Sequence, residues 1–140
     1  MEGGTGLGKT HLSLAIAKTV IEKGFGVIYG SVPAILRELE QEHFSKGSEL
    51  KTKKSLESCD LLILDDLGTE FANQFTKAVV YNLINTRMIM SKPTIINTNL
   101  SLAEIKDLYS DRLVSRIIGE HIYLEFIGKD IRLIKRKISA

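Results

Sequence analysis

The sequence predicts an α/β domain with a largely parallel sheet, because short apolar segments alternate with helix-like segments along its 140 residues. One apolar segment, Leu61–Leu64, is uninterrupted, which is typical of a strand buried on both faces of such a sheet. The length suits one compact unit, so we expect residues 1–140 to form a single domain. The hydrophobic fraction of 44% is that of a globular protein, and no apolar run approaches the roughly 18 residues that cross a bilayer.

The first half of the chain is predicted to alternate helices with two strands. The first helix has Leu12, Ile16 and Val20 four residues apart, which places them on one face, and Gly24 ends it. Pro33 suits the first turn of a second helix, because a proline there loses no hydrogen bond. In chain order we expect helix 10–23, strand 27–29, helix 33–43, a polar helix that ends near residue 58, and the strand at 61–64.

The second half is predicted to begin with a long helix and to end in a pair of strands. Ser101-Leu102-Ala103-Glu104 has the Ser-x-x-Glu pattern of a capping box, so a helix is expected to begin there. Gly128-Lys129-Asp130 separates two apolar segments that we interpret as the closing strand pair. In chain order we expect helix 73–90, strand 94–98, the helix from 101, helix 111–118, and strands 121–126 and 131–135.

The residues that follow Glu2 match the pattern G-x-x-x-x-G-K-[ST] of a phosphate-binding loop, the Walker A motif. Glycines allow successive backbone N–H groups to curl around phosphate oxygens, and the dipole of the following helix attracts the same anion. In such a loop Lys9 reaches the β- and γ-phosphates, the Thr10 hydroxyl binds Mg²⁺, and His11 lines the pocket. The loop consists of Gly3, Gly4, Thr5, Gly6, Leu7, Gly8, Lys9 and Thr10.

A pair of acids, Asp65 and Asp66, follows the buried strand, as in a Walker B motif. Open α/β sheets bind ligands at the carboxyl ends of their strands, so we expect these side chains beside the loop. We assign Asp65 to Mg²⁺, directly or through water, and Asp66 to orienting and deprotonating an attacking water. Two acids after a strand are by themselves more often a solvated strand end, and the upstream loop is what favours the catalytic interpretation.

Four segments together resemble the AAA+ ATPases, and within them the bacterial replicative helicase loaders of the DnaC and DnaI type and the IstB transposition helpers. The resemblance covers nearly the whole chain, and Asp65–Glu70 and Thr98–Leu100 are its most specific parts. It implies a P-loop NTPase fold of AAA+ type, a three-layer sandwich that binds ATP and Mg²⁺ and hydrolyses ATP to ADP and phosphate. The four segments are Gly3–Thr10, Leu61–Glu70, Pro93–Leu100 and Asp111–Arg116.

The resemblance also implies roles for residues outside the two motifs. Asn99 resembles the sensor-1 residue, which hydrogen-bonds the γ-phosphate or the attacking water. Arg116 resembles an arginine finger that acts in trans on ATP held by a neighbouring subunit, with Arg112, one helical turn earlier, as the alternative. The ordinary interpretation is a turn residue for Asn99 and a solvated helix side chain for each arginine.

The chain departs from the family pattern at two places. Asp66 is one methylene shorter than the Glu that many AAA+ proteins have there, which predicts the slow hydrolysis typical of a switch. No helical lid is expected after Arg116, because the remaining residues are interpreted as strands. A sensor-2 arginine is therefore not assigned, with Arg132 as a weak candidate.

The implied partners are a replicative helicase of the DnaB type, single-stranded DNA and further copies of the chain. Lys51, Lys53 and Lys54 lie where loader-like proteins carry a helix that faces single-stranded DNA, although a solvated helix face explains them equally well. The net charge of +2 by itself indicates no partner. Three alternatives stay open: an IstB-like helper of a transposase, a small-molecule kinase with the same phosphate loop, and a nucleotide-binding module without turnover.

Neither a zinc site nor a disulfide is supported by the sequence. The three histidines and the single cysteine, Cys59, have no metal-ligand spacing. One cysteine forms no internal disulfide, so we expect a cytoplasmic protein without a membrane partner. Because the phosphate loop begins at the third residue, we expect an N-terminally truncated fragment of a longer protein, whose sheet lacks the strand that normally precedes the loop.

Overall fold

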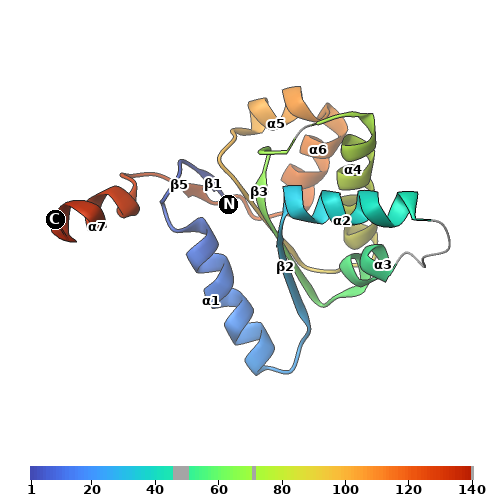
Figure 1. The fold of residues 1–140 in the computed structure, drawn as a ribbon, viewed down its shortest axis with the longest axis horizontal. Helices are drawn as coiled ribbons and strands as arrows, with labels where there is room; N and C mark the ends of the chain where they lie inside the picture. The colour runs from blue at the N-terminus through green and yellow to red at the C-terminus, as the bar shows by residue number, and fades with distance from the viewer. Residues whose placement is uncertain (46–50, 71, 140) are drawn as a thin grey trace.

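The computed structural model describes residues 1–45, 51–70 and 72–139 and confirms an α/β fold with a parallel sheet (Figure 1). The sheet has five strands in the order β2-β3-β4-β1-β5. Every neighbouring pair of strands is parallel, so all the strand carboxyl ends meet at one edge. The strands are β1 (Glu2–Gly3), β2 (Val27–Ser31), β3 (Leu61–Leu67), β4 (Thr94–Thr98) and β5 (Glu125–Phe126).

Four of the helices, α2, α4, α5 and α6, begin at a residue whose side chain caps them. The side chains of Ser101 and Glu104 each accept from the backbone of the other, which confirms the predicted capping box. Asn73 and Thr76 cap α4 in the same reciprocal way. The helices are α1 (Lys9–Glu22), α2 (Val32–Phe44), α3 (Lys51–Ser58), α4 (Gln74–Ile89), α5 (Leu102–Leu108), α6 (Asp111–Glu120) and α7 (Ile131–Ser139).

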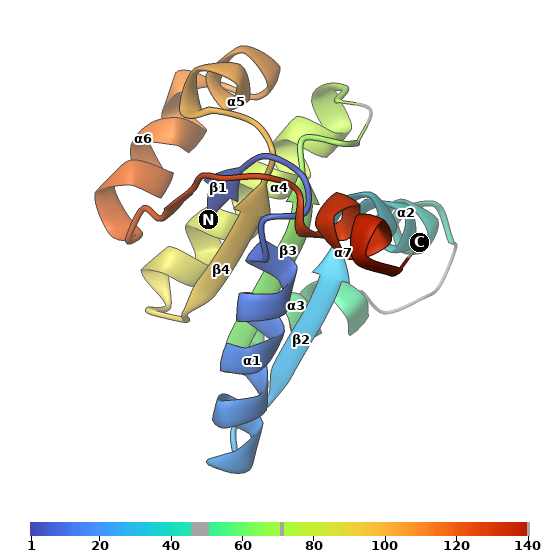
Figure 2. The same cartoon turned by 90° about the vertical axis from the view of Figure 1, so that its left-hand side faces the viewer.

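The helices form two unequal layers on the sheet: α1 packs on one face and α2–α6 on the other, and α7 lies on the side of α1 (Figure 1 and Figure 2). The side chains of β3 alternate between these layers. Leu62 and Leu64 pack into the large core with α2, α4 and α6, whereas Leu61 and Ile63 pack against α1. Because β3 is covered on both faces, its uninterrupted apolar run is explained.

The buried face of α1 differs from the predicted one. Ser13 and Ala17 are buried, Ile16 and Val20 lie partly buried beside them, and Leu12 is 37% exposed. Small side chains at the centre of the contact allow α1 to approach the sheet closely, so the larger aliphatic residues lie at its flanks. The four-residue spacing therefore predicted the correct side of the helix. The centre of the buried face lies one residue further along the chain than predicted, at Ser13 and Ala17.

The predicted closing strand pair is wrong in its second member. β5 contains only Glu125 and Phe126, and the segment from Ile131 to Ser139 is the helix α7. Its start is capped by Asp130, whose Oδ1 accepts from the backbone N–H of Arg132 at 2.9 Å. Apolar residues at 131, 134 and 138 recur at helical spacing, and four basic residues lie among them. This period fits the helix better than the alternation of Ile131, Leu133 and Lys135 fits a strand.

Before the phosphate loop, where the sequence predicts no strand, the sheet has only the two-residue β1. Glu2 lies opposite Thr98 of β4 and Glu125 of β5, so β1 occupies the position between them. The ladder extends to Met1, whose amino group donates to the carbonyl of Ile96 at 2.6 Å.

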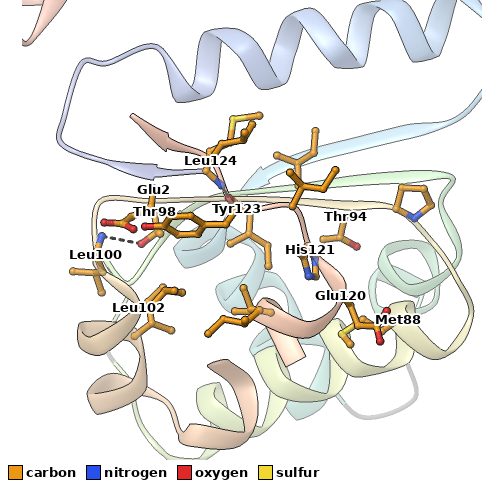
Figure 3. A pocket seen from close by; sticks show the side chains of 18 of the residues that line it. Glu2, Met88, Thr94, Thr98, Leu100, Leu102, Glu120, His121, Tyr123 and Leu124 are labelled. Atoms are coloured by element: carbon orange, nitrogen blue, oxygen red, sulfur yellow. Dashed lines mark hydrogen bonds between the residues drawn. The ribbon is translucent and has the colours of Figure 1, made fainter. Parts of the chain in front are cut away.

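Beyond Met1, an apolar groove of about 870 Å³ opens between β4, α6 and the segment 121–124 (Figure 3). Ile118, Ile122 and Tyr123 line this groove and remain 57%, 88% and 49% exposed. Across the described ranges, no helix combines the length and the apolar character needed to cross a membrane.

Candidate phosphate-binding site

The loop between β1 and α1 has the backbone of an anion-binding turn. Gly6 and Gly8 have φ values of 72° and 93°, in the left-handed region that favours glycine. Gly8 is the N-cap of α1 and no side chain caps it, so the first N–H groups of the helix stay available at the loop. Thr5 at the loop's tip is exposed.

Lys9 is only 8% exposed, and its ammonium is enclosed by the loop. Its Nζ donates to the carbonyl oxygens of Gly3 and Gly4, each at 2.6 Å. Burial lowers the pKa of Lys9 from its usual value, while the carboxylates of Asp65 and Asp66 act in the opposite direction. The loop therefore holds the ammonium group of Lys9 on its inner side. Phosphate oxygens could replace the two carbonyl oxygens as its hydrogen-bond acceptors.

Thr10 and Asp65 are in direct contact although 55 residues separate them in the chain. The Thr10 hydroxyl donates to Asp65 Oδ2 at 2.8 Å, and Asp65 Oδ1 accepts from the backbone N–H of Asp66 at 3.1 Å. The Asp65 side chain is 4% exposed at the carboxyl end of β3. The predicted loop and the predicted acid thus meet at the edge of the sheet.

Tyr29 of β2 also reaches this carboxylate, which the sequence analysis did not anticipate. Its hydroxyl donates to Asp65 Oδ2 at 2.5 Å, and this bond, with burial and the nearby carboxylates, raises the pKa of Tyr29 to about 12. The register places Ser31 opposite Asp65, so Tyr29, two residues earlier, lies on the same face of the sheet. Identifying Tyr29 as a site residue would have required the register of β2 on β3, and no local sequence pattern encodes that register.

Asp66 and Asn99 lie at the open side of the site. Asp66 is exposed and has φ 56°, a left-handed conformation that Asp tolerates better than most residues. Asn99 is exposed just after β4, and its Nδ2 lies 3.4 Å from the hydroxyl oxygen of Thr5 in the loop. Both residues are therefore exposed at the carboxyl ends of neighbouring strands, and Asn99 also lies against the loop.

Glu70 fixes the turn that follows Asp66. Its Oε2 accepts from the N–H of Gly68 at 2.8 Å, and burial raises the pKa of the Glu70 carboxyl. The hydroxyl of Thr69 in the same turn donates to the carbonyl of Asp66.

The two candidate finger arginines lie on α6 and contact α4 rather than the loop. Arg116 donates from Nε to Asn85 Oδ1 at 2.6 Å, and its guanidinium lies 5.1 Å from the centre of the Tyr81 ring. Arg112 lies at the same distance from that ring and is exposed. Arg116 is thus held in place by its own domain, and Arg112 is the more accessible of the two.

The segment before α7 passes over the phosphate loop (Figure 2). The N–H of Ile131 donates to the carbonyl of Gly6 at 3.0 Å. A Cβ on Gly6 would lie 1.8 Å from Asp130 Oδ1, so glycine is required there for space as well as for its φ. The charge of Arg132 lowers the pKa of Lys9 further, so this sensor-2 candidate lies on the same side of the molecule as the loop.

The remaining predicted residues lie apart from these contacts. His11 is exposed on α1, and the three lysines of α3 are exposed, with Lys53 3.9 Å from Glu57.

Within the described ranges, no cluster of three or more His, Cys, Asp or Glu side chains is arranged to hold a metal ion. The hydroxyl of Thr10 and the carboxylate of Asp65 are nevertheless the hard oxygen donors that Mg²⁺ prefers, with phosphate and water as its other ligands. The site therefore fits a magnesium–phosphate complex.

Comparison with known proteins adds to this geometry. The family of IstB-like ATP binding proteins matches residues 1–133. The replicative helicase loader DnaC of Escherichia coli strain K12 is 26% identical over 126 residues, which are 89% of this chain and 51% of that protein. The chain therefore spans about half the length of this curated relative.

Two solved structures have the same fold. A crystal structure of the DnaC helicase loader has a TM-score of 0.81 and 29% identity, over 90% of this chain and 76% of the other. A structure of the replication initiator DnaA bound to AMPPCP and single-stranded DNA has a TM-score of 0.80 and 30% identity, over 99% of this chain and 44% of the other.

Proposed function

Because the chain belongs to the family of IstB-like ATP binding proteins, we propose that it binds Mg-ATP at the loop Gly3–Thr10 and hydrolyses it to ADP and phosphate. Its fold is that of the AAA+ P-loop domains of DnaA and DnaC. The observation that carries the proposal is the hydrogen bond between Thr10 and Asp65, which joins the loop to the acid at the end of a buried strand. A glycine-rich turn that matched the motif by chance would not be expected to lie against an acid at the end of a buried strand.

Each part of the loop has a role in binding. Lys9 exchanges its carbonyl partners for the β- and γ-phosphate oxygens, and the free N–H groups at the start of α1 bind the same anion. Thr10 and Asp65 hold Mg²⁺, while Leu7 and His11 line the pocket. Magnesium held there would supply charge that shields the phosphate oxygens.

Asp66 and Asn99 act on the water that attacks the phosphate. Asp66 orients the water and takes its proton, and Asn99 hydrogen-bonds the γ-phosphate or the water. Their exposure beside the loop supports these roles. Because Asp66 is short, we expect slow turnover, which suits a protein whose ATP-bound state is a switch.

We infer that an arginine of α6 completes the site of a neighbouring copy. Arg116 is the first candidate, since Asn85 and Tyr81 hold its guanidinium in a fixed position. Arg112 is the alternative because it is more accessible. Either arrangement requires the chain to self-associate through its ATP sites.

The whole protein's task is proposed from its relatives. The similarity to the DnaC helicase loaders supports a DNA-replication ATPase that loads a DnaB-type helicase on single-stranded DNA in the cytoplasm. The DnaA structure with single-stranded DNA supports a DNA partner, which the exposed lysines of α3 would contact. The match to the IstB-like family favours a second candidate, an ATPase that assists a transposase.

Measuring ATP hydrolysis with and without single-stranded DNA tests the proposal, with Lys9→Ala as the inactive control. We expect slow, magnesium-dependent turnover that Lys9→Ala abolishes. Turnover that needs a small-molecule acceptor would identify a kinase, and tight ATP binding without turnover would identify a nucleotide-binding module. Complex formation with a purified DnaB-type helicase or with a transposase separates the two candidate tasks.

A further inference from the structure

Tyr29 is an unusual tyrosine because the residue is 45% exposed, while its hydroxyl donates to the carboxylate of Asp65, a residue that is only 4% exposed. It comes from β2, one of the two edge strands of the sheet, and its hydroxyl reaches the carboxyl end of β3. An exposed aromatic residue at a sheet edge gains little from burial. The contact that distinguishes this position is therefore the hydrogen bond to Asp65.

The hydrogen bonds of Asp65 show what Tyr29 contributes. A carboxylate offers about four lone-pair sites. Tyr29 and Thr10 both donate to Oδ2, and the N–H of Asp66 donates to Oδ1. Three donors from three different elements hold the carboxylate in one orientation, and Oδ1 keeps a site for a cation or its water.

Tyr29 is the one of these three donors that lies outside both the phosphate-loop region and the strand that carries Asp65. Thr10 belongs to the phosphate loop, and its hydroxyl is itself a ligand candidate. Asp66 follows Asp65 directly in β3, so its N–H is part of the same strand. Tyr29 is fixed by the β2–β3 ladder, which pairs Tyr29 with Ile63 and Ser31 with Asp65.

We propose that Tyr29 is a positioning residue that orients Asp65 for the magnesium of Mg-ATP. The proposal rests on the proposed function, because it concerns the same site. Partners of this kind, which bind a metal ligand rather than the metal, typically change metal affinity by about 10- to 100-fold. Tyr29→Phe removes the hydroxyl and keeps the ring, so it tests the bond alone.

The experiment titrates Mg²⁺ into the 140-residue chain with a fluorescent ATP analogue, for the unchanged chain, Tyr29→Phe and the control Tyr123→Phe. Tyr123 is similarly exposed, at 49%, but lies in the apolar groove. We expect Tyr29→Phe to need about tenfold more Mg²⁺ for half-maximal binding. The affinity of Tyr29→Phe for the analogue in EDTA should equal that of the unchanged chain. Tyr123→Phe should match the unchanged chain both in its magnesium requirement and in its affinity in EDTA.

A second arm places Tyr29→Phe in an Asp65→Ala background, where it should have no further effect on the magnesium requirement. An unchanged requirement in Tyr29→Phe, with normal magnesium-dependent binding by the unchanged chain, overturns the role of Tyr29 alone. Equal weakening with Mg²⁺ and with EDTA would indicate general structural damage and also overturns it. If the unchanged chain binds no nucleotide with Mg²⁺, the proposed function fails, and this inference fails with it.

Discussion

At the scale of single residues, the roles proposed above divide the candidate site into groups that would hold a ligand and groups that would act on it. Lys9 and Asp65 are buried and hydrogen-bonded, so their positions are fixed before a ligand arrives. Asp66 and Asn99 are exposed and lie beside the loop. This division predicts that variants of the two groups will have different kinetic effects.

Asp66→Asn should therefore abolish turnover without affecting binding. Asn has the same shape and also tolerates a left-handed backbone, so the turn should be preserved. It is a poor proton acceptor, and loss of a general base typically lowers kcat by about 100-fold or more. Steady-state phosphate release together with nucleotide titration measures both quantities. A variant that lost ATP affinity in proportion to kcat would show that Asp66 binds ligand instead.

At the scale of elements, a buried arginine of α4 binds segments that precede and follow this helix in the chain. Arg87 is 0% exposed and has no carboxylate partner among the described residues. Its guanidinium donates to the carbonyls of Leu56, Cys59 and Pro93 and to the hydroxyl of Thr94. One side chain thus fixes the end of α3, the approach to β3 and the start of β4.

Arg87→Met should lower the free energy of unfolding by about 3 kcal/mol or more, because several buried carbonyls would lose their donors. Arg87→Lys should also destabilise the fold, since lysine keeps the charge but not the planar fork of donors. Urea unfolding measures both variants, with Arg37→Met on the exposed face of α2 as the control. Equal stability of Arg87→Met and the control would mean that water satisfies those carbonyls.

Elements defined by local signals were predictable from the sequence. The strand Thr94–Thr98 and the capping box at Ser101 were both predicted correctly, because a proline, an apolar run and a cap lie within a few residues of each other. Asp65 was placed beside Thr10 because the carboxyl ends of parallel strands meet at one edge.

Features that depend on tertiary contacts were not predictable. Tyr29 meets Asp65 through the register of β2 on β3. Asp130 meets Gly6 because the segment before α7 crosses the loop, and no pattern in either segment indicates this contact. The strand predicted for 131–135 is wrong because a segment this short, with three apolar residues among two basic ones, fits a strand and a helix equally well.

At the scale of the whole molecule, His121 connects the apolar groove to the pH dependence of stability. It lines the groove next to Glu120 (Figure 3), and burial lowers its pKa from 6.5, with the Met1 amino group as a smaller cause in the same direction. The unfolded chain therefore binds more protons at His121 than the folded chain does. The stability contributed by neutral His121 is present above pH 6.5 and is lost as the pH falls below that value.

We expect the free energy of unfolding to decrease as the pH falls below 6.5, and to decrease less in His121→Gln. Urea unfolding of both proteins at a series of pH values measures the difference. Parallel curves for the two proteins would show that His121 does not titrate differently on folding.

The groove also predicts how the molecule binds apolar probes. Ile122 is 88% exposed within the groove, near Ile118 and Tyr123, whereas Ile89 is 76% exposed outside its lining. Contiguous apolar surface binds a dye such as anilinonaphthalene sulfonate, but a single exposed side chain does not. Ile122→Ser should therefore lower dye fluorescence while Ile89→Ser leaves it unchanged, and neither should alter stability by more than about 0.5 kcal/mol. Loosely packed chains also bind this dye, so cooperative unfolding of all three proteins is the necessary control. An equal loss of fluorescence in both variants would show that the dye reports general exposure rather than the groove.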